Sequence, residues 1–280
     1  MKSKAKPRNI FSHVRSDPIV NEVLDSFKNE ENIYWAGGLV GVQSYIPENL
    51  QRRSGDMDFI YLGSTQNTTK IRETFNESLD DLIDKGFDID ITRKRETIDI
   101  DLNRDNEFMR VQTKRRNQNN YDKHIDIITD NYLLAKPIEL YGTEALIAAP
   151  ETMIVDKLVR MNAFNRRGDL KPSIVTRATS ASLRDSELTS ILENLENRRT
   201  RLFENIEKSR LDIESERKKL ITEKIENRYF SDMFDISALD ASTKLDEEVF
   251  QSQIEDLNKK DKNFIYTIGK TLLTENRSIF

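Results

Sequence analysis

The sequence predicts an α/β (α+β) protein in which a mixed sheet flanked by helices is followed by a helical C-terminal unit with a long helix. Two patterns indicate this class. Up to about residue 140, short apolar runs typical of strands alternate with segments of helical spacing. Beyond that point the apolar residues recur mainly at three and four positions. We therefore expect two domains, 1–180 and 181–280.

The first elements of the chain lead to a pair of adjacent glycines. Helical spacing of apolar residues predicts a helix over Asp17–Asn29. A buried strand is expected over Asn32–Ala36 and runs into Gly37-Gly38. A helix is then expected to begin within Leu39–Tyr45, and Met57–Leu62 is predicted as the second strand.

The rest of the first domain continues with mixed elements. A helix is predicted over Thr68–Lys85, and Gly86 is well placed to end it. Further strands are expected at Asp88–Thr92, Thr97–Leu102, Phe108–Thr113 and His124–Ile128, the last two paired as antiparallel neighbours. The sheet is expected to end near residue 140.

The C-terminal half is predicted to be helical. Helices are expected over Thr143–Ala149 and Glu151–Asn162, separated by Pro150. After a linker at Lys171–Ser182, one long helix is predicted over about residues 184–228. A second apolar stripe over Leu245–Leu272 is expected to return antiparallel along it.

The composition excludes several classes of protein. A formal charge of -5 and a pI near 5.4 argue against a surface that binds nucleic acid over its whole extent. The chain has no Cys and only two His, which excludes disulfides and makes an oxygen-bound metal the expected kind. Neither a signal peptide nor an apolar run of membrane-spanning length is visible, so we expect a cytoplasmic protein with no membrane contact.

The chemistry is predicted to centre on Gly37-Gly38 and the segment from Ser54 to Asp58. Adjacent glycines at a strand-to-helix turn would let backbone N–H groups approach a triphosphate. Asp56 and Asp58 are two apart on a strand and therefore share a face, where both carboxylates can bind Mg²⁺ or Mn²⁺. A two-metal site needs a third carboxylate, and Asp126 in its apolar strand suits that role.

A glycine pair, an Asp-x-Asp preceded by Ser54, and a single Asp in an apolar strand resemble, in this order, the minimal nucleotidyltransferase superfamily. Within it the chain is similar to AbiEii-like toxins of type IV toxin-antitoxin systems. Those proteins continue with a Lys-bearing helix and a basic-acidic cluster, and here Asp156–Arg160 and then Arg166–Leu170 are similar in kind and order. The resemblance covers about residues 33–170.

The resemblance implies a nucleotidyltransferase fold and a role for each matched residue. Asp56, Asp58 and Asp126 would be the catalytic metal ligands. Gly37, Gly38, Ser54 and Lys157 would bind the nucleotide, with Lys157 on the triphosphate. The implied reaction transfers NMP from an NTP to an RNA such as tRNA, or to protein, with release of pyrophosphate. Many members are toxins paired with an antitoxin.

Two other interpretations stay open from the sequence. One is a catalytically silent nucleotidyltransferase-fold protein that binds or regulates through its helical domain. The other is a coiled-coil interaction protein that self-associates through the C-terminal helices. Two further Asp-x-Asp pairs, Asp88/Asp90 and Asp99/Asp101, are interpreted as the solvated face of an exposed strand.

Overall fold

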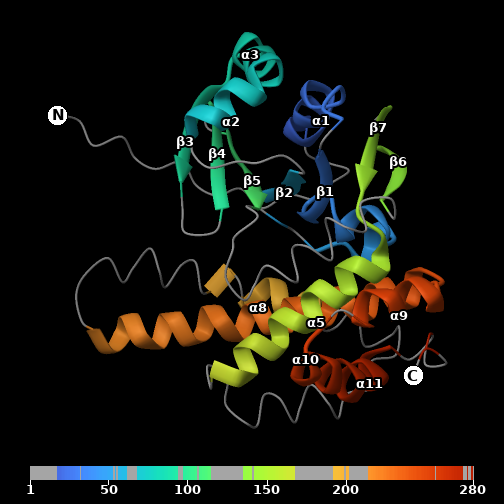
Figure 1. The fold of residues 1–280 in the computed structure, drawn as a ribbon. Helices are drawn as coiled ribbons and strands as arrows, with labels where there is room; N and C mark the ends of the chain where they lie inside the picture. The colour runs from blue at the N-terminus through green and yellow to red at the C-terminus, as the bar shows by residue number, and fades with distance from the viewer. Residues whose placement is uncertain are drawn as a thin grey trace. The chain divides into compact units, whose positions relative to one another are not determined.

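A computed structural model describes residues 18–31, 33–52, 54, 56–61, 68–93, 97–105, 107–114, 135–140, 142–167, 192–198, 200–201, 214–255, 257–273, 276 and 279. These residues form a mixed α/β protein with two compact units (Figure 1). Unit 1 comprises residues 1–44 and 53–149, and unit 2 comprises 45–52 and 150–280. The predicted boundary at residue 180 lies outside the described residues and stays a prediction.

Unit 1 is built on a seven-stranded mixed sheet in its described part, with the strand order β3-β4-β5-β2-β1-β7-β6. The strands are β1 (Ile33–Gly38), β2 (Asp56–Tyr61), β3 (Asp88–Arg93), β4 (Thr97–Arg104), β5 (Glu107–Lys114), β6 (Lys136–Leu140) and β7 (Thr143–Ile147). Two neighbouring pairs, β1 with β7 and β2 with β5, are parallel, and the other four are antiparallel. The predicted strands at 88–92 and 97–102 are confirmed.

In its described part, unit 1 has the α-helices α1 (Pro18–Ser26), α2 (Thr68–Thr74) and α3 (Asn76–Asp84). The single helix predicted over 68–85 is interrupted, because Phe75 adopts a non-helical backbone conformation between α2 and α3. Gly86 ends α3 with φ of 89°, as predicted. Four aromatic rings pack edge-on or tilted between these helices and the sheet, with neighbouring centroids 5.5–6.2 Å apart: Phe27, Trp35, Phe59 and Phe75.

The helix predicted at Thr143–Ala149 is wrong, and so is the end of the sheet near residue 140. Thr143–Ile147 is strand β7, which forms a hairpin with β6 and a parallel bridge from Ile147 to Trp35 of β1 (Figure 1). Gly142, with φ of 76°, lies in the short connection between Leu140 and Thr143. The strand forms because its pairing partner β1 comes from a distant part of the chain, which a local pattern does not reveal.

Unit 2 is helical in its described part. Its elements are η2 (Glu48–Leu50), α5 (Pro150–Arg167), a helical segment at 192–198, α8 (Glu214–Ser242), α9 (Glu247–Glu255), α10 (Lys259–Phe264), a π-helical turn η4 (Ile265–Gly269) and α11 (Lys270–Leu272). Helix α5, in yellow-green, lies along α8, in orange (Figure 1). Pro150 begins α5, as predicted.

The long C-terminal helix differs from its prediction at the C-terminal end. Helix α8 continues to Ser242 rather than ending near residue 228, and every residue from 232 to 240 is buried. A helix covered all round in this way belongs to the interior of its unit, which explains why the amphipathic pattern fades there. The predicted returning stripe over 245–272 is divided among α9, α10, η4 and α11 instead of one helix. No helix among the described residues has the length and apolar character needed to cross a membrane.

Candidate functional site

The two glycines that end β1 pack directly against the strand that carries the predicted acidic residues. Gly37 lies opposite Asp58, and a Cβ at position 37 would lie 2.4 Å from the Asp58 carboxylate oxygen Oδ2. Gly38 has φ of 61°, and a Cβ there would lie 2.2 Å from the carbonyl oxygen of Asp56. The Leu39 N–H donates to the same carbonyl at 2.7 Å. Both positions therefore require glycine for close packing on β2.

The helix predicted to begin within Leu39–Tyr45 is wrong. The chain turns after Gly38 and forms only the 3₁₀ turn η1 (Val42–Ser44). The turn is tight, because the Gly41 N–H donates to the Gly37 carbonyl at 3.1 Å and a Cβ at position 41 would lie 2.5 Å from the Gly37 nitrogen. A three-residue turn has no appreciable helix dipole, so the glycine pair is not backed by a helix N-terminus.

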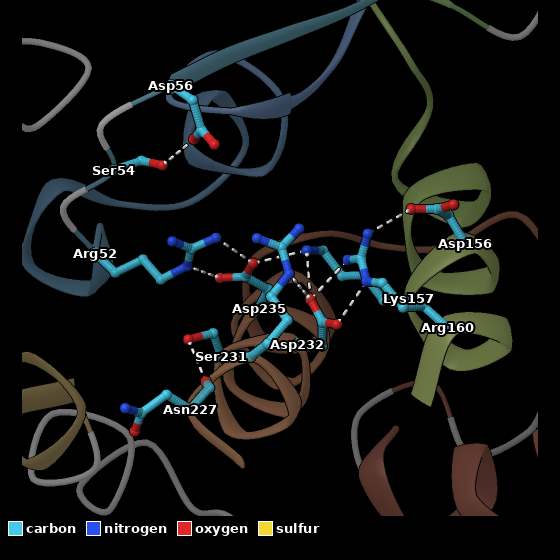
Figure 2. A network of polar contacts seen from close by, with 11 residues as sticks. Arg52, Ser54, Asp56, Asp156, Lys157, Arg160, Asn227, Ser231, Asp232 and Asp235 are labelled. Atoms are coloured by element: carbon cyan, nitrogen blue, oxygen red, sulfur yellow. Dashed lines mark hydrogen bonds and ion pairs between the residues drawn. The ribbon is translucent and has the colours of Figure 1, made fainter. Parts of the chain in front are cut away.

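Asp56 and Asp58 lie on β2 with their side chains on the same face of the sheet, as the spacing predicted. Asp58 is buried at 8% exposure, whereas Asp56 is partly exposed. Ser54 is buried, and its hydroxyl donates to Asp56 Oδ1 at 2.7 Å (Figure 2). The serine thus orients one of the two carboxylates, while its predicted contact with a nucleotide stays a prediction.

The acidic pair is part of a larger polar area that crosses three strands. Register pairs Asp56 with Arg110 and Asp58 with Gln112 on β5, and pairs those two with Asp101 and Asp99 on β4. Paired residues in neighbouring strands point to the same side of the sheet. We call this group the acidic face: Asp56, Asp58, Asp99, Asp101, Arg110 and Gln112. Among the described residues, this group contains four carboxylates and one guanidinium.

The two β5 residues donate their hydrogen bonds toward β4. Arg110 binds Asp101 through two hydrogen bonds, Nε to Oδ1 at 2.6 Å and Nη2 to Oδ2 at 2.8 Å, and its Nε lies 3.4 Å from Asp99 Oδ2. The Gln112 amide nitrogen Nε2 donates to Asp99 Oδ1 at 2.7 Å. The hydrogen bond to Asp101 raises the pKa of Arg110; burial opposes this, and the charges of Asp101, Asp99 and Asp56 add to it.

Asp99 is a residue of this face that the sequence pattern did not identify. Asp88 and Asp90 on β3 are exposed, in agreement with their interpretation as a solvated strand face. The same interpretation is wrong for Asp99, which is fully buried. Strand β4 lies between β3 and β5, and Asp99 alternates with buried apolar residues of the opposite face. No local signal separates the two Asp-x-Asp pairs, because their difference lies in the position of each strand within the sheet.

Asp126, the predicted third carboxylate, lies outside the described residues, as does the whole strand predicted over 124–128. Its role as a metal ligand therefore stays a prediction. Within the described ranges, no group of three or more His, Cys, Asp or Glu is arranged to hold a metal ion. Asp56 and Asp58 bring two carboxylates to the face, so a complete oxygen-ligand set requires a further donor.

Lys157 lies in unit 2, in a buried ionic network between α5 and α8 (Figure 2). Its ammonium group lies 2.7 Å from Asp235 Oδ2 and 3.4 Å from Asp232 Oδ1. Arg52 binds Asp235 through two hydrogen bonds of 2.7 and 2.9 Å. Arg160 binds Asp232 in the same way, at 2.8 and 2.7 Å. Lys157 itself is only 6% exposed.

The two aspartates of this network are fully buried and ionised. Burial raises the pKa of Asp232, but the charges of Arg160 and Lys157 outweigh it and hold the pKa below its ordinary value. Burial also raises the pKa of Asp235, but the charges of Arg52 and Lys157 and their hydrogen bonds outweigh this effect and hold the pKa well below its ordinary value. Lys157 therefore has two anionic partners within its own unit. The predicted contact of Lys157 with a triphosphate stays a prediction.

Comparison with protein-family models, with curated proteins and with solved structures finds no match to this chain. The class that the fold and the site define is therefore a mixed α/β protein with an acidic sheet face beside a glycine pair.

Proposed function

We propose that the protein is a metal-dependent nucleotidyltransferase, which transfers NMP from an NTP to an acceptor hydroxyl with release of pyrophosphate. The observation that carries this proposal is the seating of the Asp58 carboxylate against Gly37, with Asp56 on the same face. In the sequence, the glycine pair and the Asp-x-Asp segment preceded by Ser54 occur in the order that the resemblance to the minimal nucleotidyltransferase superfamily implies.

Asp56 and Asp58 offer part of the ligand set that a divalent cation such as Mg²⁺ or Mn²⁺ needs. Hard cations prefer oxygen ligands, and both Asp56 and Asp58 offer carboxylate oxygens. The Asp58 carboxylate occupies the space that a Cβ at position 37 would fill, so Asp58 can lie there only because residue 37 is glycine.

Each residue has a proposed task in the reaction. Asp56 and Asp58 would bind the cation, and Asp126 would supply the third carboxylate for a second one. A bound cation would neutralise triphosphate oxygens and lower the pKa of the attacking hydroxyl. Ser54 would hold Asp56 in its orientation through their hydrogen bond. Gly37 and Gly38 would position the phosphates of the nucleotide at the end of β1.

The test is incorporation of label from each α-labelled NTP into RNA, tRNA and protein acceptors in the presence of Mg²⁺ or Mn²⁺. Asp58→Asn should reduce labelling by about 100-fold or more, since loss of a metal ligand exceeds the loss typical of residues behind the ligands. Asp90→Asn is the matched control, because Asp90 belongs to an Asp-x-Asp pair on the exposed strand β3. Equal labelling by wild type and Asp58→Asn would defeat the proposal.

The rival is a catalytically silent protein of the same fold that acts through its helical unit. Calorimetry with Mg²⁺ and each NTP separates the two, since the silent protein would bind no nucleotide. The proposed biological role is that of a toxin in a toxin-antitoxin or phage-defence system. Growth arrest on expression, relieved by the product of an adjoining gene, would support that role, and arrest that persists in Asp58→Asn would oppose it.

A further inference from the structure

Arg110 occupies a position from which it could pair with either of two aspartates. It lies on β5 between Asp56 of β2 and Asp101 of β4, and register places it directly opposite both. Neighbouring strands are separated by about 4.8 Å, so the Arg110 backbone is about equally close to each. An ion pair with Asp56 would place a fixed positive charge on a proposed metal ligand.

The side-chain contacts decide between these two partners. Among the described residues, Arg110 makes its ion pairs with Asp101 and Asp99 on β4 and none with Asp56. The paired hydrogen bonds to Asp101 match the planar guanidinium fork, which is the strongest geometry for such a contact. Asp99 adds a second negative charge on the same side, with Oδ2 at 3.4 Å from Nε. Both carboxylates of β4 thus attract the guanidinium away from β2.

Gln112 repeats the arrangement one row further along. It lies opposite Asp58 on one side and Asp99 on the other, and its amide N–H donates to Asp99 at 2.7 Å. Asp99 is fully buried, so its position is held by the surrounding sheet. At both positions, the side chain on β5 donates its hydrogen bonds to carboxylates of β4.

We propose that Asp101 and Asp99 are positioning residues that hold Arg110 toward β4, and thereby prevent an ion pair between Arg110 and Asp56, a proposed ligand of a divalent cation. This inference rests on the proposed function and adds a requirement to the same site. The four aspartates then fall into two kinds: those of β4 neutralise the protein's own donors, and those of β2 bind the cation.

The test is the affinity of the purified full chain for Mn²⁺ alone, measured by the loss of the free-ion signal in electron paramagnetic resonance. Asp101→Asn should weaken Mn²⁺ binding about fivefold, because Arg110 would be released to pair with Asp56. Asp101→Asn combined with Arg110→Gln should restore wild-type affinity or better, since the competing cation is gone. A purely structural role of Asp101 would not be rescued by this second change.

The controls separate failure of this inference from failure of the proposed function. Asp58→Asn should abolish the binding and so assign it to this site; if wild type binds no Mn²⁺, both the proposed function and the inference are overturned. If wild type and Asp101→Asn bind equally, or if the double variant stays as weak as the single one, only the inference is overturned. Circular dichroism of each variant checks that the sheet has formed.

Discussion

Replacing Asp235 by Asn should strongly destabilise the helical unit. Asp235 has no exposed surface, and its partners Arg52 and Lys157 have side chains only 9% and 8% exposed. The substitution keeps the shape of the side chain but removes the negative charge, which leaves two buried cations with less compensation. Breaking a buried ion pair at one partner typically costs about 3–5 kcal/mol. We expect about 3 kcal/mol here, because Lys157 keeps Asp232 at 3.4 Å.

Urea unfolding measures this effect. With a slope of about 2 kcal/mol/M, a loss of about 3 kcal/mol lowers the urea midpoint by roughly 1.5 M. Circular dichroism at 222 nm follows the helices, and fluorescence of Trp35, the single Trp of the chain, follows unit 1 separately. Hydrogen exchange of peptides from α5 and α8 should accelerate in the variant, which assigns the loss to these helices.

A matched control within unit 2 is Arg166→Ala. Arg166 forms an ion pair with Asp261 at 3.4 Å, but its side chain is 44% exposed. Exposed pairs typically contribute less than about 1 kcal/mol, so this variant should shift the midpoint only slightly. If Asp235→Asn and Arg166→Ala shift it equally, burial is not what makes the network important, and the reasoning from desolvation is refuted.

Three further outcomes are expected. Gly37→Ala should displace the Asp58 carboxylate, which would lie 2.4 Å from the new Cβ, and should abolish Mn²⁺ binding in calorimetry. The control is Gly142→Ala, where φ is 76° and nothing lies within 4 Å of the new Cβ; backbone strain should lower the free energy of unfolding by about 1 kcal/mol without affecting Mn²⁺ binding. Because the pKa of Asp235 is lowered in the folded protein, this carboxylate stabilises the fold above the ordinary carboxyl pKa, and the stabilisation is lost as Asp235 becomes protonated. The urea midpoint of the helices should therefore fall progressively below about pH 4, and the contribution of Asp235 should change little above that pH. Phe59→Ala, which removes a fully buried ring at the centre of the aromatic cluster, should cost about 3–5 kcal/mol in the unfolding of unit 1 followed by Trp35 fluorescence, and a loss under 1 kcal/mol would contradict its place in the core.

Local sequence patterns located most of the elements that carry the candidate site. The spacing of two residues between Asp56 and Asp58 predicted that they share a face, since side chains in a strand alternate with period two. The strands β3 and β4 and the start of α5 at Pro150 were equally visible, because each depends on residues that are neighbours in the chain. The absence of Cys likewise limited metal ligands to oxygen donors with little room for nitrogen.

Local patterns failed where a residue's environment comes from distant parts of the chain. Thr143–Ile147 is a strand because β1 and β6 pair with it, and the segment after Gly38 turns instead of forming a helix because it packs on β2. In both cases the tertiary contact overrides the local preference. The end of the long helix was predicted too early for the same reason: residues 232–240 of α8 are all buried, so no amphipathic pattern marks them as helical.

The amino-acid sequence by itself determined which acids alternate on which strand and excluded cysteine as a ligand of any metal. Only the tertiary structure decided what each charge contacts. Asp99 and Asp90 stand in the same kind of motif, yet one is buried beside Arg110 and the other is exposed, because β4 lies inside the sheet and β3 at its edge. Lys157 meets Asp235 across 78 residues of chain. Burial and ion pairing depend on three-dimensional neighbours, and a spacing pattern describes only neighbours along the chain.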